Sequence, residues 1–201
     1  MLAAKLFVLS GKRVFSMSKI GRKPIDIGDV QVEIKGQEIH YKGKKTSGIH
    51  ILPDVLTAQL NGRTLLLLPS VDKTSRNVQK DANRVWGLHR ALLFNEIKGS
   101  DVAFEKEMII NGLGFKAVVS GQKVVFSLGY SHKIDFELPS EVTLEVDKTG
   151  QKLMFRSSNK FLVGHICSMV RALRPPEPYK GTGIKLATEV IVRKAGKTKA
   201  A

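Results

Sequence analysis

The sequence has little cysteine, no long apolar run and a shortage of acidic residues. Its 201 residues contain a single cysteine, Cys167, which excludes an internal disulfide and a multi-thiolate metal site. One thiol suits a reducing compartment, and its setting in FLVGHICSMV predicts a small buried side chain rather than a nucleophile. No apolar run approaches the roughly 18 residues of a membrane span, so we expect no membrane partner.

The sequence also lacks a recognisable catalytic motif. Its histidines do not have the spacing of metal ligands; they are His40, His50, His89, His132 and His165. His165 and Cys167 lie two positions apart in a predicted helix, so they point in different directions. NGLGF and KGTGI are fragments of glycine-rich loops without the Gly-Lys-Ser/Thr ending of a phosphate loop. We therefore expect no enzyme, cofactor, metal or small-molecule substrate; the competing enzyme hypothesis predicts nucleotide binding.

Basic residues are abundant. The chain has 33 lysines and arginines against 18 acidic residues, a formal charge of +15, while its hydrophobic share of 42% is ordinary for a globular protein. Such an excess of one sign opposes compactness unless a partner neutralises it. A polyanion, above all a nucleic acid, is the partner that this charge favours. A merely soluble basic surface is the alternative.

The N-terminal segment carries cations and no acid before Asp26. Residues 1–16, MLAAKLFVLSGKRVFS, mix leucines and aromatics with basic residues and serine, as a positive amphipathic mitochondrial presequence does. A short secretory signal and a disordered basic arm are the other interpretations. RVFS has an arginine two places before its aromatic residue, as in a matrix-peptidase cleavage site.

The sequence contains an internal repeat at an offset of 85 residues. When VQVEIKGQEIHYKGKKTSGIHILP is placed beneath FKAVVSGQKVVFSLGYSHKIDFELP, Gly36 and Gln37 fall on Gly121 and Gln122. Apolar positions match along both segments, and one inserted residue aligns the prolines that close them. A duplication explains this common order of turns and strands.

Each copy predicts hairpins followed by a helix. Alternating apolar residues flank the glycine turns, and Asn61-Gly62 and Lys148–Gly150 mark a second hairpin in each copy. The period then becomes helical over about Ala82–Ile97 and Lys160–Leu173. The predicted inward residues are Val85, Leu88, Leu92 and Leu93 in the first helix, and Leu162, Ile166, Met169, Val170 and Leu173 in the second. We expect an α+β fold of two tandem duplicated domains, each a small antiparallel β-sheet packed against one α-helix.

The C-terminal part combines stiffness with positive charge in RPPEPYKGTGIKL. Pro175 disfavours helical geometry at Arg174, so the second helix ends there, and the prolines predict an extended path of low entropy. Gly181 and Gly183 predict close approach of the backbone to another surface. Tyr179 either stacks on a base or sugar or packs on its own domain. A proline-rich exit from a helix and a solvated tail over 194–199 are the alternative interpretations.

These residues carry a resemblance to a known family. RPPEPYKGTGIKL resembles the Arg-x-Pro-Glu-Pro-Tyr-Lys-Gly-x-Gly signature of large-subunit ribosomal protein L6. MSKIGRKPI looks like the bacterial N-terminus of that family, NGLGFKAVVSGQKVVFSLGYSHKIDFELP like its central hairpins, and GLHRALLFNEIKG like the helix that closes its first domain. The resemblance covers about 17–190. Thr182 departs from it, since lysine is common at that position, and this puts one phosphate contact in doubt.

The resemblance implies a structural constituent of the large ribosomal subunit that binds large-subunit rRNA and supports translation. Such proteins lie near the sarcin–ricin region and the stalk base, beside other ribosomal proteins and where translation factors dock. The implied rRNA-binding residues are Arg174, Tyr179, Lys180, Gly181, Gly183 and Lys185, with Lys160 in addition. A non-ribosomal RNA- or DNA-binding module is the alternative.

The resemblance and the repeat together predict the organisation of the chain. We expect a presequence-like extension over 1–16, a first domain over 17–98, a second domain with the rRNA-binding arm over 99–185, and a basic tail over 186–201. The bacterial-type pattern behind a leader implies the large ribosomal subunit of the mitochondrial matrix. A plastid or the bacterial cytoplasm is the alternative location.

Overall fold

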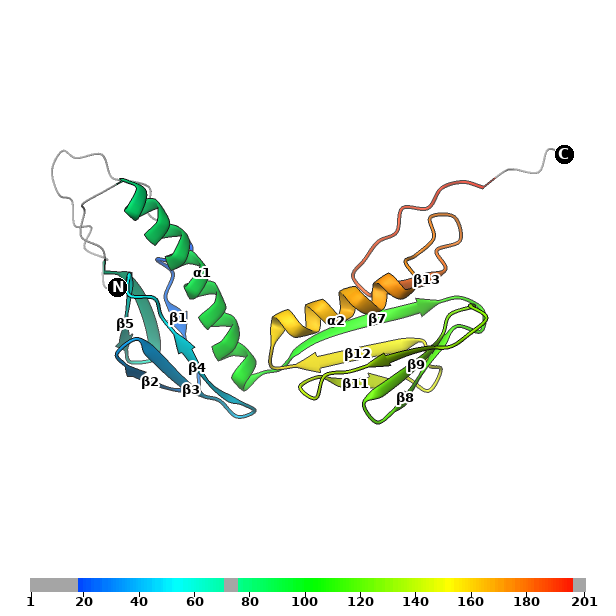
Figure 1. Ribbon diagram of the computed structural model, residues 1–201, viewed down its shortest axis with the longest axis horizontal. Helices are drawn as coiled ribbons and strands as arrows, with labels where there is room; N and C mark the ends of the chain where they lie inside the picture. The colour runs from blue at the N-terminus through cyan, green and yellow to red at the C-terminus, as the bar shows by residue number, and fades with distance from the viewer. Residues whose placement is uncertain (1–17, 71–75, 197–201) are drawn as a thin grey trace, which may run out of the picture. The chain divides into compact units, whose positions relative to one another are not determined.

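A computed structural model describes residues 18–70 and 76–196. In this part of the chain it contains two helices and a series of short strands (Figure 1). The chain divides into two compact units, the first mainly of residues 18–94 and the second mainly of residues 95–196; Asp29–Val32 and Tyr41–Gly48 group with the second. The α+β class is as predicted.

The strands that precede the first helix form two small sheets with the orders β1-β6-β5 and β2-β3-β4. Their bounds are β1 Ile25–Asp26, β2 Gln31–Lys35, β3 Glu38–Lys42, β4 Ser47–Ile51, β5 Leu56–Asn61 and β6 Thr64–Pro69. Gly36 and Gly62 turn the two predicted hairpins with φ of 62° and 60°, a backbone region that favours glycine. Both hairpins are confirmed.

Helix α1, Arg76–Asp101, extends beyond the predicted Ala82–Ile97 at both ends. At the C-terminal end the helix continues through the small residues Gly99 and Ser100, where the sequence suggested an end. The Ser100 hydroxyl donates to the Ile97 carbonyl oxygen at 2.7 Å, so its side chain bonds within the last turn instead of breaking it.

The buried face of α1 also differs from the predicted one. Leu93 is buried, but Leu88 and Leu92 are 55% and 41% exposed. The indole of Trp86 is buried and its Nε1 donates to the Leu67 carbonyl oxygen at 2.8 Å. This large anchored side chain turns the helix so that its buried apolar residues are Ala82, Trp86, Leu93 and Ile97.

The second unit repeats the combination of short strands and one helix. Its elements are β7 Phe104–Asn111, β8 Lys116–Ser120, β9 Lys123–Ser127, β10 Ile134–Glu137, β11 Thr143–Val146, β12 Lys152–Ser157, α2 Lys160–Leu173 and β13 Gly183–Leu186. The sheets have the orders β10-β9-β8 and β11-β12-β7-β13, and neighbouring strands in both are antiparallel. The predicted turns lie at Gly121 and Gly150, with φ of 64° and 72°. The predicted sheet is thus divided into two smaller ones in each half of the chain.

Helix α2 begins and ends where the sequence predicts. The Asn159 side chain caps it by accepting from the amides of Phe161 and Leu162 at 3.0 and 3.3 Å. Arg174 leaves the helix with φ −150° and ψ 88°, one residue before Pro175. The buried side chains are Val163, Ile166, Cys167 and Val170, whereas the predicted inward residue Met169 is 45% exposed.

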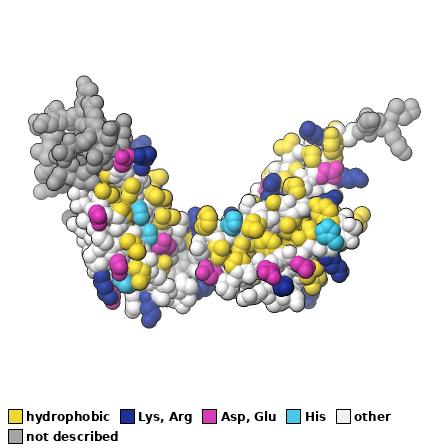
Figure 2. Space-filling model, viewed as in Figure 1, with side chains coloured by type: hydrophobic (Ala, Val, Ile, Leu, Met, Phe, Trp, Pro, Cys, Tyr) yellow, Lys and Arg dark blue, Asp and Glu magenta, His cyan; other side chains and the backbone are white. Residues whose placement is uncertain are grey.

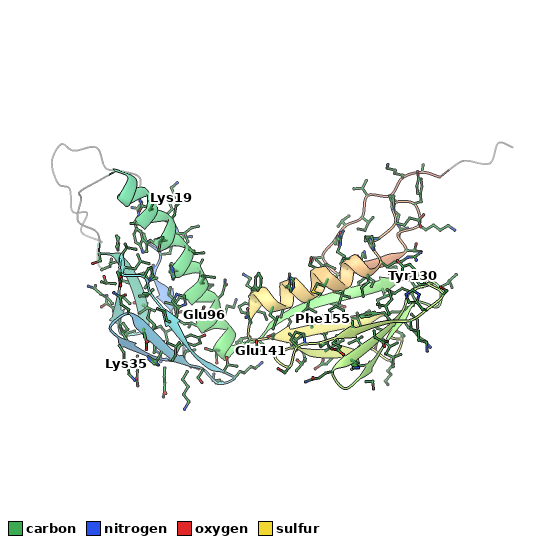
Figure 3. All side chains as sticks on the ribbon, viewed as in Figure 1. Lys19, Lys35, Glu96, Tyr130, Glu141 and Phe155 are labelled. Carbon is green, nitrogen blue, oxygen red and sulfur yellow. The ribbon has the colours of Figure 1, made fainter. Side chains whose placement is uncertain are left out.

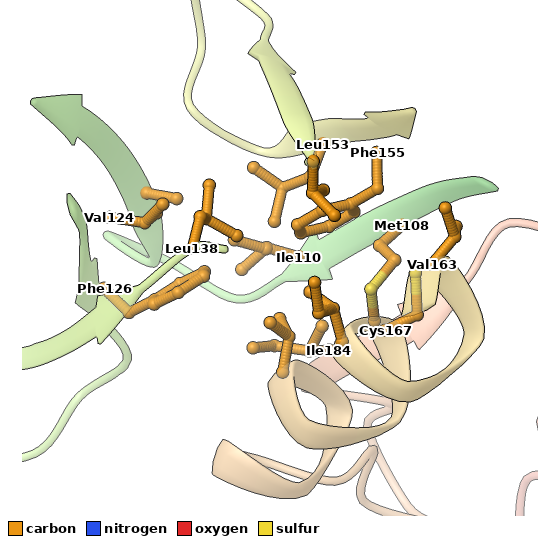
Figure 4. Packing of buried hydrophobic residues seen from close by; sticks show 14 of the residues in the cluster. Met108, Ile110, Val124, Phe126, Leu138, Leu153, Phe155, Val163, Cys167 and Ile184 are labelled. Carbon is orange, nitrogen blue, oxygen red and sulfur yellow. The ribbon is translucent and has the colours of Figure 1, made fainter. Parts of the chain in front are cut away.

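The core of the second unit lies between α2 and the strands (Figure 4). Met108 and Ile110 of β7 share this buried cluster with Cys167 of α2 and with Phe155 of β12, which is fully buried. Ile184 of β13 is also fully buried in this cluster. Because burial of such a side chain contributes about 1.5–3 kcal/mol, the strand that follows the proline segment is held firmly.

Candidate nucleic-acid interface

Residues Arg174–Thr182, called the arm below, form a closed loop at the C-terminal end of α2. The amide of Glu177 donates to the Thr182 carbonyl oxygen at 2.9 Å, and the amide of Gly181 donates to the Glu177 carbonyl oxygen at 2.9 Å. The Thr182 hydroxyl donates to the Glu177 carboxylate at 3.0 Å. The arm as a whole therefore folds back on itself, a closure that the path expected for the prolines did not include. Prolines fix φ but leave the other amides free to bond, and Gly181, with φ 72°, lets the chain turn back.

Gly183 closes the base of the arm. The Ile184 amide donates to the Arg174 carbonyl oxygen at 2.8 Å, and Gly183 has φ 135°. A Cβ atom at Gly183 would lie 2.6 Å from the Pro175 carbonyl oxygen and 2.8 Å from the Pro176 Cα. The tight approach predicted for this glycine exists, but the surface it meets is the backbone of the arm itself.

Arg174 seats the arm on two aromatic rings. Its guanidinium carbon lies 4.8 Å from the ring centre of Tyr130 and 5.5 Å from that of Phe115. The Tyr130 hydroxyl donates to the Leu173 carbonyl oxygen at 3.1 Å, which fixes that ring beside the end of α2 (Figure 3). Cation–π contacts of this kind contribute about 0.5–1 kcal/mol at exposed sites. Arg174 thus positions the arm, and it remains half-buried there.

Tyr179 and Lys180 lie in the turn at the tip of the arm, between Pro178 and Gly181. Tyr179 is 52% exposed and Lys180 is exposed. Of the two interpretations given for Tyr179, packing inside its own domain fits this exposure poorly. Among the described residues Lys180 forms no ion pair, so its ammonium group is available to an outside anion.

The structure separates the remaining predicted residues. Lys185 lies half-buried on β13, with its Nζ 3.5 Å from the Glu189 carbonyl oxygen. Lys160 is the first residue of α2, where its Nζ lies 3.4 Å from the Asn95 Oδ1 and 5.8 Å from the Phe104 ring centre. A 14-residue helix is about 21 Å long, so Lys160 stands at the opposite end of α2 from Arg174. The arm and Lys160 do not form one site.

The segment that follows β13 also reaches the arm, although the sequence predicted only a basic tail there. The Lys194 amide donates to the Pro178 carbonyl oxygen at 2.9 Å, which brings a predicted tail residue to the tip of the arm. Gly181 is buried beside this segment, and a Cβ atom there would lie 3.2 Å from the Arg193 Nη2. In Figure 2, several dark blue Lys and Arg side chains lie over the region of the arm and the segment after it, among hydrophobic and acidic ones. The one signal in the sequence is Glu189, an isolated acid within a basic stretch.

Cys167 and His165, whose side chains could in principle act in catalysis, take part in packing instead. Cys167 is buried, and this burial raises the pKa of its thiol, which keeps it protonated. His165 is exposed and stacks on Phe161 at 6.0 Å between ring centres, so the predicted divergence of His165 and Cys167 is confirmed. Within the described residues there is no group of three His, Cys, Asp or Glu that could hold a metal ion. In the same residues no helix is long and apolar enough to cross a bilayer.

Comparisons with known proteins agree on one family. The family pattern described as Ribosomal protein L6 matches residues 111–186, which include the arm. The chain is 39% identical over 183 residues to the large ribosomal subunit protein uL6 of Methylacidiphilum infernorum, covering 90% of this chain and 98% of the relative. It is 41% identical over 191 residues to that of Anaeromyxobacter dehalogenans (92% and 100%) and 39% identical over 184 residues to that of Beijerinckia indica (91% and 100%).

Proposed function

The chain belongs to the ribosomal protein L6 family, and we propose that it is a structural component of the large ribosomal subunit that binds large-subunit rRNA through the arm. The observation that carries this proposal is the similarity to uL6 proteins over about nine-tenths of the chain. The closed, exposed arm on a basic chain supports the choice of site. The role is structural, and no catalytic step belongs to it.

The arm binds RNA by charge and shape. Lysine and arginine neutralise phosphates and release condensed counterions, so affinity falls as salt rises. Folded RNA presents phosphates and 2′-hydroxyls more readily than paired base edges, so backbone contacts dominate. Because Arg174, Gly181 and Gly183 hold the arm in one conformation before binding, little entropy is lost when it docks. These residues shape the site, while Tyr179 and Lys180 meet the RNA.

The finer location follows from the family resemblance. We place the chain near the sarcin–ricin region and the stalk base, with neighbouring ribosomal proteins beside it and translation factors docking close by. Lys185 and Lys160 are retained as rRNA contacts in this proposal, Lys160 as a separate contact at the other end of α2. A structure of the assembled subunit with the arm turned away from every nucleotide contradicts the placement.

The organelle is also a proposal. The relatives reported above are bacterial, and the presequence predicted over 1–16 lies outside the described residues. We propose that the protein works in the mitochondrial matrix, with a plastid or the bacterial cytoplasm as the alternative. N-terminal sequencing of protein purified from ribosomes tests this: a start near Ser16 or Met17 supports import and cleavage, and a start at Met1 opposes it.

We also propose that the two domains, 17–98 and 99–185, arose by duplication. Matched hydrogen bonds support it. The Gln37 carbonyl oxygen accepts from the Leu52 amide at 2.8 Å, and the Gln122 carbonyl oxygen accepts from the Leu138 amide at 2.9 Å. A common ancestor explains why these bonds follow the same hairpin in both copies.

Sedimentation tests the central proposal. A tagged chain expressed in its own cells is expected to travel with large subunits and joined ribosomes through a sucrose gradient at moderate salt. A chain that stays at the top of the gradient favours the alternative, a non-ribosomal RNA- or DNA-binding module. Titration with nucleotides separates both from the enzyme hypothesis, which alone predicts nucleotide binding.

A further inference from the structure

The segment after β13, Ala187–Lys194, is held against the second unit at several points along its length. The Ala187 amide donates at 3.0 Å to the carbonyl oxygen of Glu107, which lies on β7, the strand that pairs with β13. The Lys194 amide donates to the Pro178 carbonyl oxygen at 2.9 Å, at the tip of the arm. The segment therefore runs from the sheet to the tip and has a defined path there.

Between these attachments lies a charged clamp. Arg171, in the last turn of α2, donates from Nε to Glu189 Oε2 at 2.9 Å and from Nη2 to Glu189 Oε1 at 2.5 Å. The Leu186 amide lies 3.4 Å from the same carboxylate. A two-pronged pair of this kind fixes direction as well as distance. Its effect is to aim the residues after Glu189 toward the arm.

The clamp delivers two cations to the tip. Arg193 lies with its guanidinium over Gly181, and Lys194 is tied by its amide to Pro178, next to Tyr179 and Lys180 in the chain. Lys180, Arg193 and Lys194 are all exposed. In the described part of the chain none of the three is paired with a carboxylate. Against these three cations the arm carries one acid, Glu177, whose carboxylate accepts from the Thr182 hydroxyl, so positive charge exceeds negative charge at this tip.

We propose that Lys180, Arg193 and Lys194 form one phosphate-binding cluster for successive phosphates of an RNA backbone, and that Arg171 and Glu189 are positioning residues that assemble it. This rests on the proposed rRNA-binding function and deepens it, because it adds two ligands from beyond the arm and a device that places them. Glu189 is an acid that strengthens the binding of a polyanion through the residues it orients.

A charge-swap cycle in the full chain tests the clamp, with protein-free large-subunit rRNA as the probe. The variants are Arg171→Glu, Glu189→Arg and the double swap. Each single change removes the clamp, so affinity is expected to fall about five- to tenfold and the salt slope by up to about two units as two phosphate contacts are lost. The double swap restores the ion pair but not the bond from the Leu186 amide, so it is expected to recover most of the lost affinity.

Glu189→Arg is the decisive variant, because it makes the chain more basic. If charge alone governed binding, this change would tighten it; the proposed clamp predicts weaker binding. Affinity and salt slope equal to or above those of the original chain overturn the proposal. Thermal unfolding of each variant separates loss of the clamp from loss of the fold. Glu189→Gln keeps a side chain of the same shape, and its rRNA affinity is expected to lie between those of Glu189→Arg and the original chain.

Hydrogen exchange gives a readout that does not depend on RNA. The Lys194 amide is expected to be protected in the original chain and in the double swap, and to exchange freely in both single variants. Unchanged protection in the singles contradicts the clamp even where RNA binding weakens. The original chain could bind no rRNA while the Lys194 amide follows this pattern. That result contradicts both the proposed function and the phosphate-binding cluster, and it supports only the contact of Ala187–Lys194 with the arm.

Discussion

The helix of the first unit, α1, is followed by a strand after only two residues, whereas α2 is followed by the arm, β13 and the clamped segment. Ahead of the two helices, the two halves of the chain share the same order of hairpins and turns. The Leu56 amide donates to the Pro53 carbonyl oxygen at 2.9 Å, and the Val142 amide donates to the Pro139 carbonyl oxygen at 3.0 Å. The common sheets and helix therefore supply the folded core of each half, and the part of the chain after α2 supplies the proposed RNA contact.

Ion pairs neutralise cations in both units, Lys123 with Glu137 and Arg156 with Glu105 in the second, but not at the tip of the arm. In the first unit the Lys35 Nζ lies 3.7 Å from Glu33, and Arg84 pairs with Asp81. Exposed pairs of this kind contribute at most about 1 kcal/mol, but they do reduce the charge offered to a polyanion. At the tip of the arm, cations are gathered without such partners among the described residues. The tip of the arm therefore offers more unpaired positive charge to an anion than these paired positions do.

The largest expected effect is a loss of folding stability when alanine replaces Gly183, compared with the same change at Gly36; both glycines have positive φ. Gly183→Ala places a Cβ atom 2.6 Å from the Pro175 carbonyl oxygen, so the arm must shift; Gly36→Ala meets nothing within 4 Å. We expect Gly183→Ala to lower the free energy of unfolding by about 3 kcal/mol, from backbone strain and displaced packing together. Gly36→Ala, with strain alone, is expected to cost about 1–2 kcal/mol. Urea denaturation measures both, and equal losses contradict the crowded geometry at Gly183.

A smaller effect is expected at the exposed ring of the arm. Tyr179→Ala removes a stacking surface worth about 1–3 kcal/mol per base, so rRNA affinity is expected to fall about tenfold. Tyr179→Phe keeps the ring and serves as the matched control, with affinity close to that of the original chain. Equilibrium binding to large-subunit rRNA measures both variants. Full affinity in Tyr179→Ala shows that charge alone distinguishes the second unit from the first.

The smallest effect concerns pH. The hydrogen bonds from Arg171 hold the pKa of the Glu189 carboxyl below its ordinary value of about 4.3. A lowered pKa in the folded state means that the stabilising contribution is present above the ordinary pKa and is lost as pH falls through the folded value. The Leu186 amide signal is expected to shift only as the pH falls below the ordinary pKa of a glutamate carboxyl, whereas the Leu52 amide, bonded to the Gln37 carbonyl oxygen, stays constant. A Leu186 shift that is complete above pH 5 contradicts the clamp.

Much of the fold was predictable because its signals are local. Glycine at positive φ marks the hairpins at Gly36 and Gly121, and Pro175 marks the end of α2. The face of α1 was not predictable in this way. Its leucines suggested one face, but the hydrogen bond from Trp86 to a strand distant in the sequence selects another.

The candidate site was predictable in composition but not in shape. Prolines and glycines identified the arm, yet its closure depends on bonds between Glu177 and Thr182 that no periodicity encodes. The contribution of Lys194 depends on a bond to Pro178, sixteen positions earlier, and on the pairing of Arg171 with Glu189. Contacts of this kind belong to the tertiary structure, and only coordinates reveal them.

The salt dependence of rRNA binding tests most directly whether the second unit makes the principal contact. Two triple variants are matched in charge. The arm variant changes Lys180 of the arm and Arg193 and Lys194 of the following segment to alanine; the first-unit variant changes Lys19, Lys35 and Arg63, all exposed, to alanine. We expect the arm variant to flatten the slope of log affinity against log salt by about two to three units, and the first-unit variant by less than about half a unit. Equal flattening by the two variants, or a larger effect from the first unit, contradicts the account.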